Sequence, residues 1–238
     1  MLANKSILAV VPARGGSKGV PRKNLRLLKG KPLIQYTIEV IKECHWIDHA
    51  LVSTDDEEIS KVAISLGMNV PFLRPLELAQ DFVPDMPVLK HALEFEEKRL
   101  NKEFDVVLML QPTCPLRVPS NMLECALLLL EGDYEAVWTV SQADLKYHPD
   151  KQLKISDSGH ITFFTEKGGQ IVARQQLSPT FYRNGNTYAF TRNSVLNSAS
   201  TLSSKTGALL LKDDQVNIDS IEDFEKAERI LQSLTPNA

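Results

Sequence analysis

The sequence predicts an α/β fold in which a mostly parallel sheet carries helices on both faces. Three observations predict it. Strand-length apolar stretches alternate with helix-length amphipathic segments along the first 140 residues, which is the pattern of repeated strand–helix units. Several of these stretches are apolar at consecutive positions, as strands buried on both faces are. Segments rich in Gly, Asp and Arg follow them, and ligands bind beyond the carboxyl ends of such strands.

Each element is placed by its own sequence signals. We expect strands at residues 7–11, 50–54, 69–72, 105–110, 135–140, 186–190 and 216–219. We expect helices at residues 32–44, 55–67, 86–100, 121–132 and 220–234. Pro32 suits a first helical turn, and Gly67 follows a helix that opens with acids. Ser220 and Asp223 form a capping box at the start of the last helix.

Residues 141–183 interrupt this alternation. They contain short β-prone runs separated by Ser-Gly and Gly-Gly turns, which indicate a hairpin-like insertion. The insertion has too few apolar residues to pack alone. We therefore divide the chain into an α/β domain, residues 1–140 and 184–238, and a small β-rich insertion, residues 141–183.

A strongly basic segment surrounds and follows the first expected strand. Residues 1–38 contain eight Lys or Arg and no Asp or Glu, although the whole chain has a net charge of −3. A basic end on an acidic chain indicates an anionic ligand at that end. Nucleic acid is disfavoured, because the basic residues lie in one short loop and form no long basic face.

The composition of this loop indicates a polyphosphate. Gly15, Gly16 and Gly19 let the backbone approach a ligand and present N–H groups to it. The next helix N-terminus favours negative charge, and the loop matches neither a Walker A motif nor a GxGxxG fingerprint. The alternative interpretation is a surface loop with solvated lysines. The cationic donors of the loop are Arg14, Lys18, Arg22 and Lys23.

Other function classes receive little support. Cys44, Cys114 and Cys125 lack CxxC spacing, and the five histidines lack HxxxH or HExxH spacing, so neither a disulfide framework nor a zinc site is expected. The sequence has no signal-peptide pattern and no apolar run of bilayer length. We expect a cytoplasmic protein that binds neither membranes nor nucleic acid.

Six segments in chain order resemble the cytidylyltransferases that activate nonulosonic acids, namely the CMP-sialic acid synthetases and their relatives for legionaminic and pseudaminic acids. The segments read ARGGSKGVPRKN, VSTDDEEI, RPLELAQD, LQPTCPLR, YRNGNTYAF and NIDSIEDFEKAE. The resemblance spans about residues 7–231. It implies a Rossmann-like nucleotidyltransferase fold of the glycosyltransferase-A type, and a CTP-dependent transfer that yields a CMP-sugar and pyrophosphate.

The same resemblance implies roles for individual residues. Lys23, Arg14 and Asp219 would be the catalytic residues. Arg74 and Asp81 would lie near the cytidine, whereas Cys114 would be a small packing residue. The side chains that face the sugar would be Gln111, Thr113 and Tyr188. The triphosphate would be bound by Arg14, Gly15, Ser17, Lys18, Lys23 and Asn24.

By this resemblance the insertion is the dimerisation element of a homodimer and reaches over the partner's site. Arg174 would bind the sugar carboxylate, which suits a planar guanidinium. Lys146 and His148 are weaker candidates for that role. The alternatives are that Arg174 is an ordinary surface arginine and that Tyr188 is a core tyrosine of a strand.

The resemblance also implies Mg²⁺ as cofactor, at a motif that usually reads D-x-D. Here the motif reads Asn217–Ile218–Asp219. A strand would place Asn217 and Asp219 on one face, and Mg²⁺ is often held by one or two carboxylates together with substrate phosphates. The alternative is that both side chains cap the helix that follows.

Two rival functions stay open. A CMP-Kdo synthetase shares the fold and reaction, but an acid is expected after the fourth strand in that group, and LQPTCPLR has none. A non-catalytic nucleotide-sugar binding protein is disfavoured by Arg14, Lys23, Gln111 and Asp219. Among nonulosonic acids, GGSKGVPRKN and YRNGNTYAF favour a legionaminic-type substrate.

Overall fold

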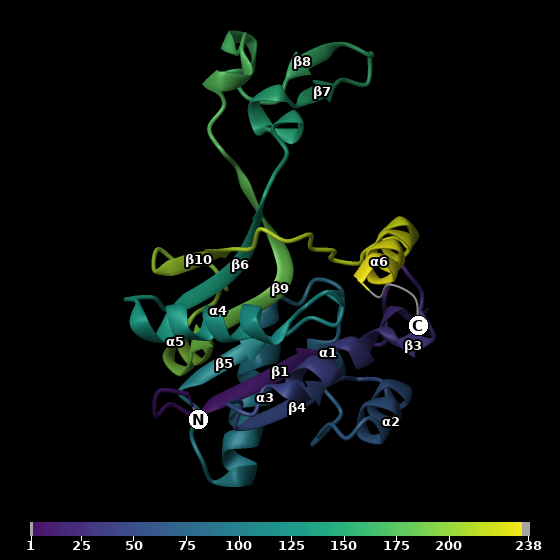
Figure 1. The fold of residues 1–238 in the computed structure, drawn as a ribbon, viewed down its shortest axis with the longest axis vertical. Helices are drawn as coiled ribbons and strands as arrows, with labels where there is room; N and C mark the ends of the chain where they lie inside the picture. Colours follow the sequence, from purple (N-terminus) through teal and green to yellow (C-terminus); the bar gives the residue numbers. More distant parts are fainter. Residues whose placement is uncertain (1, 235–238) are drawn as a thin grey trace.

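The computed structural model describes residues 2–234 and has a six-stranded central sheet of order β10-β6-β9-β5-β1-β4 (Figure 1). Strands β4, β1 and β5 are parallel, and so are β10 and β6, whereas β9 runs antiparallel between β5 and β6. The predicted α/β fold with a mostly parallel sheet is therefore confirmed. The strands are β1 Ile7–Pro12, β4 His49–Ser53, β5 Val106–Met109, β6 Ala136–Gln142, β9 Phe181–Thr191 and β10 Thr206–Leu210.

Helices cover both faces of this sheet. Ile7 and Ala9 of β1 pack in one core with α1, α2 and α4, and Leu8 and Val10 pack in a second core with α3 and α5. Because β1 is buried on both faces, its sequence is apolar at consecutive positions. None of the helices within residues 2–234 is long and apolar enough to cross a membrane. The helices are α1 Leu33–Glu43, α2 Glu57–Ser65, α3 Asp85–Leu100, α4 Pro119–Glu131 and α5 Arg192–Asn197.

A third apolar cluster places the last helix, α6 (Ile221–Leu234), beside the basic loop. Phe224 of α6 packs in it with Val20 and with Ile218, which precedes the helix. The small hairpin of β2 (Leu27–Leu28) and β3 (Lys31–Pro32) borders the same cluster. The predicted capping box is present, because Ser220 N–H donates to the Asp223 carboxylate at 2.9 Å and Asp223 N–H donates to the Ser220 hydroxyl at 3.3 Å.

Two expected strands are not found, and several elements, among them the β2–β3 hairpin, α5 and β10, are not expected from the sequence. Residues 69–72 contribute only an isolated bridge at Asn69, because Pro71 has no N–H for a ladder. Residues 216–219 lie outside the sheet, and the Ile218 N–H donates to the Thr113 carbonyl, in the loop after β5, at 2.8 Å. The short helix α5 and the Gly-containing strand β10 lack clear sequence signals.

Strands β6 and β9 continue as a paired ribbon into an arm, residues 143–180, that stands away from the sheet (Figure 1). Gln142 still pairs with Phe181, so the ribbon passes the boundaries expected at residues 140 and 184. The expected hairpin is formed by β7 (Leu153–Ile155) and β8 (Ile161–Phe163). The division of the chain into two domains stays a prediction.

Candidate active site

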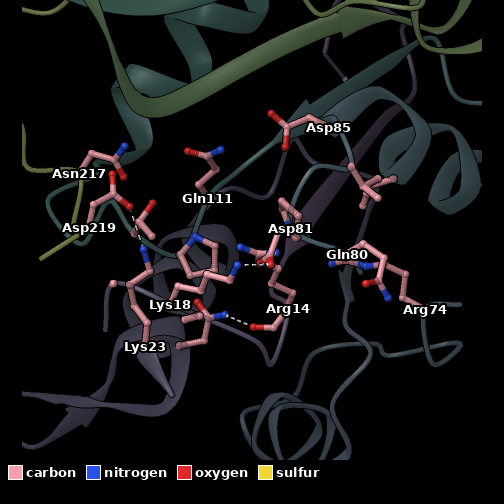
Figure 2. A pocket seen from close by; sticks show the side chains of 18 of the residues that line it. Arg14, Lys18, Lys23, Arg74, Gln80, Asp81, Asp85, Gln111, Asn217 and Asp219 are labelled. Carbon is pink, nitrogen blue, oxygen red and sulfur yellow. Dashed lines mark hydrogen bonds and ion pairs between the residues drawn. The ribbon is translucent and has the colours of Figure 1, made fainter. Parts of the chain in front are cut away.

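A cavity of about 600 Å³ lies beyond the carboxyl ends of β1 and β5, where α/β sheets bind ligands. Figure 2 shows side chains from the basic loop, from the loop before α3 and from residues 217–219 around it. Gly15, Lys146 and Arg174 are not part of its lining. The predicted residues that line it are Arg14, Ser17, Lys18, Lys23, Asn24, Arg74, Asp81, Gln111, Thr113, Tyr188, Asn217 and Asp219.

Acids from other segments accompany the cations of the basic loop. Asp81 forms ion pairs with Lys18 and with Arg14, whose Nη1 lies 3.0 Å from Asp81 Oδ1. The hydrogen bond from Lys18 and that from Arg14 hold the pKa of Asp81 below its ordinary value. The basic loop thus contains no acid in its own sequence, but an acid from another segment contacts it in the folded structure. In this structure Asp81 lies against the basic loop.

Lys23 joins this loop to residues 217–219. Its Nζ donates to Asp219 Oδ1 at 2.9 Å and to the Ile218 carbonyl at 2.8 Å (Figure 2). Although residues 1–38 contain no acid, Lys23 therefore has an acid partner, because Asp219 is distant only along the chain. Gly19 permits the close approach, since a Cβ there would lie 2.4 Å from the Asp219 carbonyl oxygen.

Asp56 anchors the basic loop from outside the cavity. Its carboxylate caps α2 by accepting hydrogen bonds from the N–H groups of Glu58 and Ile59, each at 2.9 Å, and it forms an ion pair with Arg22. Burial would raise the pKa of Asp56, but the hydrogen bonds from Arg22 and the backbone hold it below the ordinary value. Gly15 packs on this carboxylate, because a Cβ at Gly15 would lie 2.6 Å from Asp56 Oδ2. Gly15 therefore faces the start of α2.

Arg74 is a buried cation in the cavity wall. Its Nε donates to the Ser53 hydroxyl at 3.0 Å and its Nη1 donates to the Leu78 carbonyl at 3.4 Å, so the end of β4 fixes its orientation. Burial lowers the pKa of Arg74 to about 10, which leaves it charged at neutral pH. Because the protein uses most of its donors, Arg74 shapes the wall and has few donors left for a ligand.

A buried arginine that sequence reasoning did not select holds the LQPTCPLR segment. Arg117 donates to the carbonyls of Gln111 at 2.8 Å and Asn186 at 2.6 Å, and to the Thr37 hydroxyl at 2.7 Å. Burial lowers its pKa to about 10. These bonds fix the backbone of Gln111, so the Gln111 side chain reaches the cavity from a rigid turn (Figure 2). The position of Arg117 at the end of the motif LQPTCPLR was the sequence signal that could have identified it.

Cys114 packs in the interior, as expected. Its Sγ donates to the Asn184 carbonyl at 3.3 Å, and burial raises its pKa to about 11. The thiol is therefore protonated near neutral pH and unsuited to nucleophilic attack. Gly185 leaves it room at a φ of +76°, since a Cβ there would lie 2.8 Å from the sulfur.

The wall formed by β9 and the start of α3 carries Tyr188, Arg183 and Asp85, of which only Tyr188 is predicted. Its ring packs edge-on to Trp138 with centroids 5.6 Å apart, and burial raises its pKa to about 12, so the phenol is neutral. The predicted role of Tyr188 and its core alternative are both compatible with this position. The segment YRNGNTYAF contains Arg183 and was a sequence signal for it. The only sequence signal for Asp85 is its position at the start of a helix.

Asn217 and Asp219 both face the cavity, although they do not belong to a strand. Ile218 between them is buried in the third cluster. Neither side chain caps α6, because Ser220 and Asp223 do so. No group of three His, Cys, Asp or Glu side chains suited to a metal occurs in residues 2–234. One carboxylate and one amide oxygen fit a Mg²⁺ ion that takes its other ligands from phosphates and water.

Lys146 and Arg174 lie on the arm. Lys146 is in the 3-10 helix Leu145–Tyr147 and pairs with Asp144, and Arg174 opens a second 3-10 helix. Both side chains are exposed. His148 is buried at the base of the arm, where its Nδ1 accepts a hydrogen bond from the Asp150 N–H at 3.1 Å. In this chain alone, none of these three residues contributes to the cavity.

Comparison with known proteins gives the family that the six sequence segments resemble, and the match covers nearly all of the chain. The profile of the cytidylyltransferase family matches residues 8–233. The CMP-N,N'-diacetyllegionaminic acid synthase of Legionella pneumophila is 34% identical over 228 residues, which are 95% of this chain and 96% of the relative. The pseudaminic acid cytidylyltransferase of Campylobacter jejuni is 28% identical over 92% of this chain and 94% of the relative.

Solved structures share the fold at lower sequence identity. A CMP:2-keto-3-deoxy-manno-octonic acid synthetase complexed with CTP superposes with a TM-score of 0.71 and 16% identity, over 97% of this chain and all of that one. The 4-diphosphocytidyl-2C-methyl-D-erythritol synthase of Anaerococcus prevotii superposes with a TM-score of 0.64 and 15% identity, over 96% of each chain.

Proposed function

The chain belongs to the cytidylyltransferase family, and we propose that it activates a nonulosonic acid with CTP to give the CMP-sugar and pyrophosphate. The observation that carries this proposal is one cavity in which the basic loop, Gln111 and residues 217–219 meet. Cations of the basic loop line one part of the cavity, and Gln111 and Tyr188 line another, together with the charged groups of Asp85 and Arg183. A triphosphate beside a polyhydroxylated sugar acid would match these two parts.

In the proposed reaction, the anomeric hydroxyl of the sugar acid attacks the α-phosphorus of CTP. A new P–O bond forms while the bond from that phosphorus to the bridging oxygen of the β-phosphate breaks; the proton of the hydroxyl is lost to solvent, and pyrophosphate leaves. Arg14, Lys18 and Lys23 would bind phosphate oxygens and offset the charge that grows on the leaving group. Because Asp81 now pairs with Arg14 and Lys18, the triphosphate would compete with Asp81 for them.

We propose that Mg²⁺ is the cofactor and that Asp219 and Asn217 hold it. Their oxygen atoms and their shared position at the cavity support this assignment. A metal bound there would supply Lewis-acid stabilisation of charge on the phosphate oxygens. Asp219 would then serve both the cation and Lys23, whose Nζ already donates to it.

A legionaminic-type acid is the proposed substrate. The identity of 34% to the diacetyllegionaminic acid synthase supports this choice. Since the donor is CTP, the proposal places the reaction in the cytoplasm.

We also propose a homodimer in which the arm of one subunit reaches the cavity of the other. Ile155, Phe164 and Val172 on the arm are exposed by 73%, 55% and 88%, which is unusual for apolar side chains gathered on one small element. A second copy of the chain would cover them. Arg174, which lies on the same arm, would then be presented to the partner's substrate.

A pyrophosphate-release assay tests the proposed function. The purified protein is incubated with CTP, Mg²⁺ and one acid at a time from a panel of legionaminic, pseudaminic, N-acetylneuraminic and 3-deoxy-octulosonic acids. We expect release with at least one nonulosonic acid, and none with CTP alone. Release only with the eight-carbon acid would assign the rival synthetase activity, and no release with any acid would contradict an enzymatic role.

A further inference from the structure

Asp85 and Arg183 are two opposite charges that line the same cavity without pairing. Asp85 is the first residue of α3, and Arg183 lies on β9. Within residues 2–234, neither side chain forms an ion pair within 4.0 Å or a hydrogen bond. By contrast, Arg14 and Lys23 of the same cavity are both paired with acids. The two charges are therefore free to bind a ligand.

Both groups are held in place by their surroundings. The guanidinium of Arg183 lies 5.4 Å from the ring centroid of Trp138, and such stacking fixes a guanidinium plane. Asp85 is half-buried at a helix start, and Figure 2 shows it directed into the cavity near Gln111. Burial raises the pKa of Asp85, while the nearby charge of Arg183 opposes that shift. A half-buried carboxylate without a donor is unfavourable, so a ligand donor would stabilise it.

We infer that Asp85 and Arg183 bind an acylamino group of the sugar acid between them. A secondary amide has an N–H donor on one side and a carbonyl acceptor on the other. The N–H would donate to the carboxylate of Asp85, and the carbonyl oxygen would accept from the guanidinium of Arg183. Val88 and the ring of Tyr188 line the same cavity and offer an apolar surface for the acyl methyl group.

This inference rests on the proposed function and narrows its substrate class to acylamino nonulosonic acids. A hydroxyl at the same carbon also donates and accepts, but its single oxygen reaches over a shorter distance than an amide does. Asp85 would then be left half-buried without a donor, whereas Arg183 is exposed to water, and the cost at Asp85 is what makes such a site discriminate. The pair would therefore set a preference among sugar acids without touching the triphosphate.

The test compares matched substrates and variants. The substrates are N,N'-diacetyllegionaminic acid, N-acetylneuraminic acid, and the analogue of the latter that carries a hydroxyl in place of the acetamido group. Asp85→Ala and Arg183→Ala are each expected to lower kcat/KM for the acetamido acids by about 10- to 100-fold. The kcat/KM for the hydroxyl analogue should fall by a smaller factor than that for the acetamido acids, and the KM for CTP should change by no more than about threefold.

Further measurements separate binding from folding and from the reaction itself. Because neither side chain forms an ion pair or hydrogen bond with the described residues, and Arg183 contacts Trp138 only by stacking, both variants should keep a melting temperature near that of the wild type. The double variant should lose less than the product of the single losses, since both residues bind one amide. Equal losses for acetamido and hydroxyl substrates would overturn the inference, as would a wild-type preference for the hydroxyl analogue. A wild-type protein inactive with all three acids would instead contradict the proposed function.

Discussion

Lys23 and Asp219 form an ion pair at the cavity, with Nζ 2.9 Å from Oδ1. Lys23 also donates to the Ile218 carbonyl at 2.8 Å, and the Ile218 N–H donates to the Thr113 carbonyl at 2.8 Å. One series of contacts therefore links the loop after β1, the segment before α6 and the loop after β5. A ligand that binds Lys23 or Asp219 would act on all three.

Lys23→Ala is expected to lower turnover far more than stability. Removing a cation that binds a reacting triphosphate costs about 10²-fold or more in rate. The lost ion pair and hydrogen bond should lower the free energy of unfolding by only about 1 kcal/mol, because Asp219 is largely exposed. Initial rates at saturating CTP, measured beside denaturant unfolding curves, check both quantities.

Lys31→Ala is the matched control for this prediction. Lys31 pairs with an acid, Glu39 at 2.9 Å, but lies outside the cavity lining. The Lys31→Ala protein should therefore keep wild-type turnover. A folded Lys23→Ala protein with the activity of the Lys31 control would show that Lys23 does not bind the reacting phosphates.

Asp219→Asn is expected to raise the Mg²⁺ concentration for half-maximal rate and to cut the rate by orders of magnitude, about 10²-fold or more. A hard divalent cation prefers an anionic oxygen, so Asn217→Ala should have a milder effect. Asn217→Asp should remain active, with equal or tighter dependence on Mg²⁺. A magnesium titration of initial rates for the three variants measures these changes.

The capping alternative for this motif makes a different prediction. Ser220 and Asp223 already cap α6, so Ser220→Ala should lower the melting temperature and leave the Mg²⁺ dependence unchanged. If Asp219→Asn behaves as Ser220→Ala does, the motif is structural and the metal assignment fails.

Asp56→Ala is expected to raise the KM for CTP several-fold and to destabilise α2 by about 1 kcal/mol, because it removes both the Arg22 anchor and the helix cap. Asp56→Asn keeps a capping oxygen and loses the charge, so it should be nearly as stable yet still bind CTP less tightly. CTP titrations and melting curves of both variants separate the two roles. An unchanged KM in both would show that the loop needs no anchor.

The low pKa of Asp56 gives this anchor a pH dependence. Its folded pKa lies below the ordinary value, so its contribution to stability is complete above the unfolded pKa of about 4. The contribution is lost as the pH falls through the lower folded pKa. Wild-type stability should therefore decline more than that of Asp56→Asn on acidification below about pH 4, as unfolding curves across that range would show.

Local sequence patterns were sufficient for the main elements, and the resemblance to the cytidylyltransferases supplied most of the predicted cavity lining. The strand over Ile7–Pro12 and the helix over Glu57–Ser65 have strong periodicity and clear end signals. Parallel strands then bring the loops that follow them to one edge of the sheet. For that reason Lys23 and Gln111, which are far apart in sequence, could be assigned to one site.

What the sequence did not predict depends on contacts in space. The acid partners of the basic loop, Asp56, Asp81 and Asp219, come from three distant segments, so the absence of acids within the loop was misleading. Residues 216–219 look like a strand because Val216 and Ile218 are buried, but their burial is against α6. Arg183 belongs to the segment YRNGNTYAF, but nothing in that segment distinguishes it from its neighbours, and the fold is what places it at the cavity.

Two inactive variants are expected to restore activity to each other if the arm acts on the partner's cavity. Arg174 lies on the arm and Lys23 in the cavity, so a mixed dimer of Arg174→Ala and Lys23→Ala subunits would contain one site with both residues intact. After random exchange, about a quarter of wild-type activity should return, because half of the dimers are mixed and each has one intact site. Either variant incubated alone through the same exchange provides the control. A mixture that never exceeds the better parent would show that Arg174 does not act across the dimer.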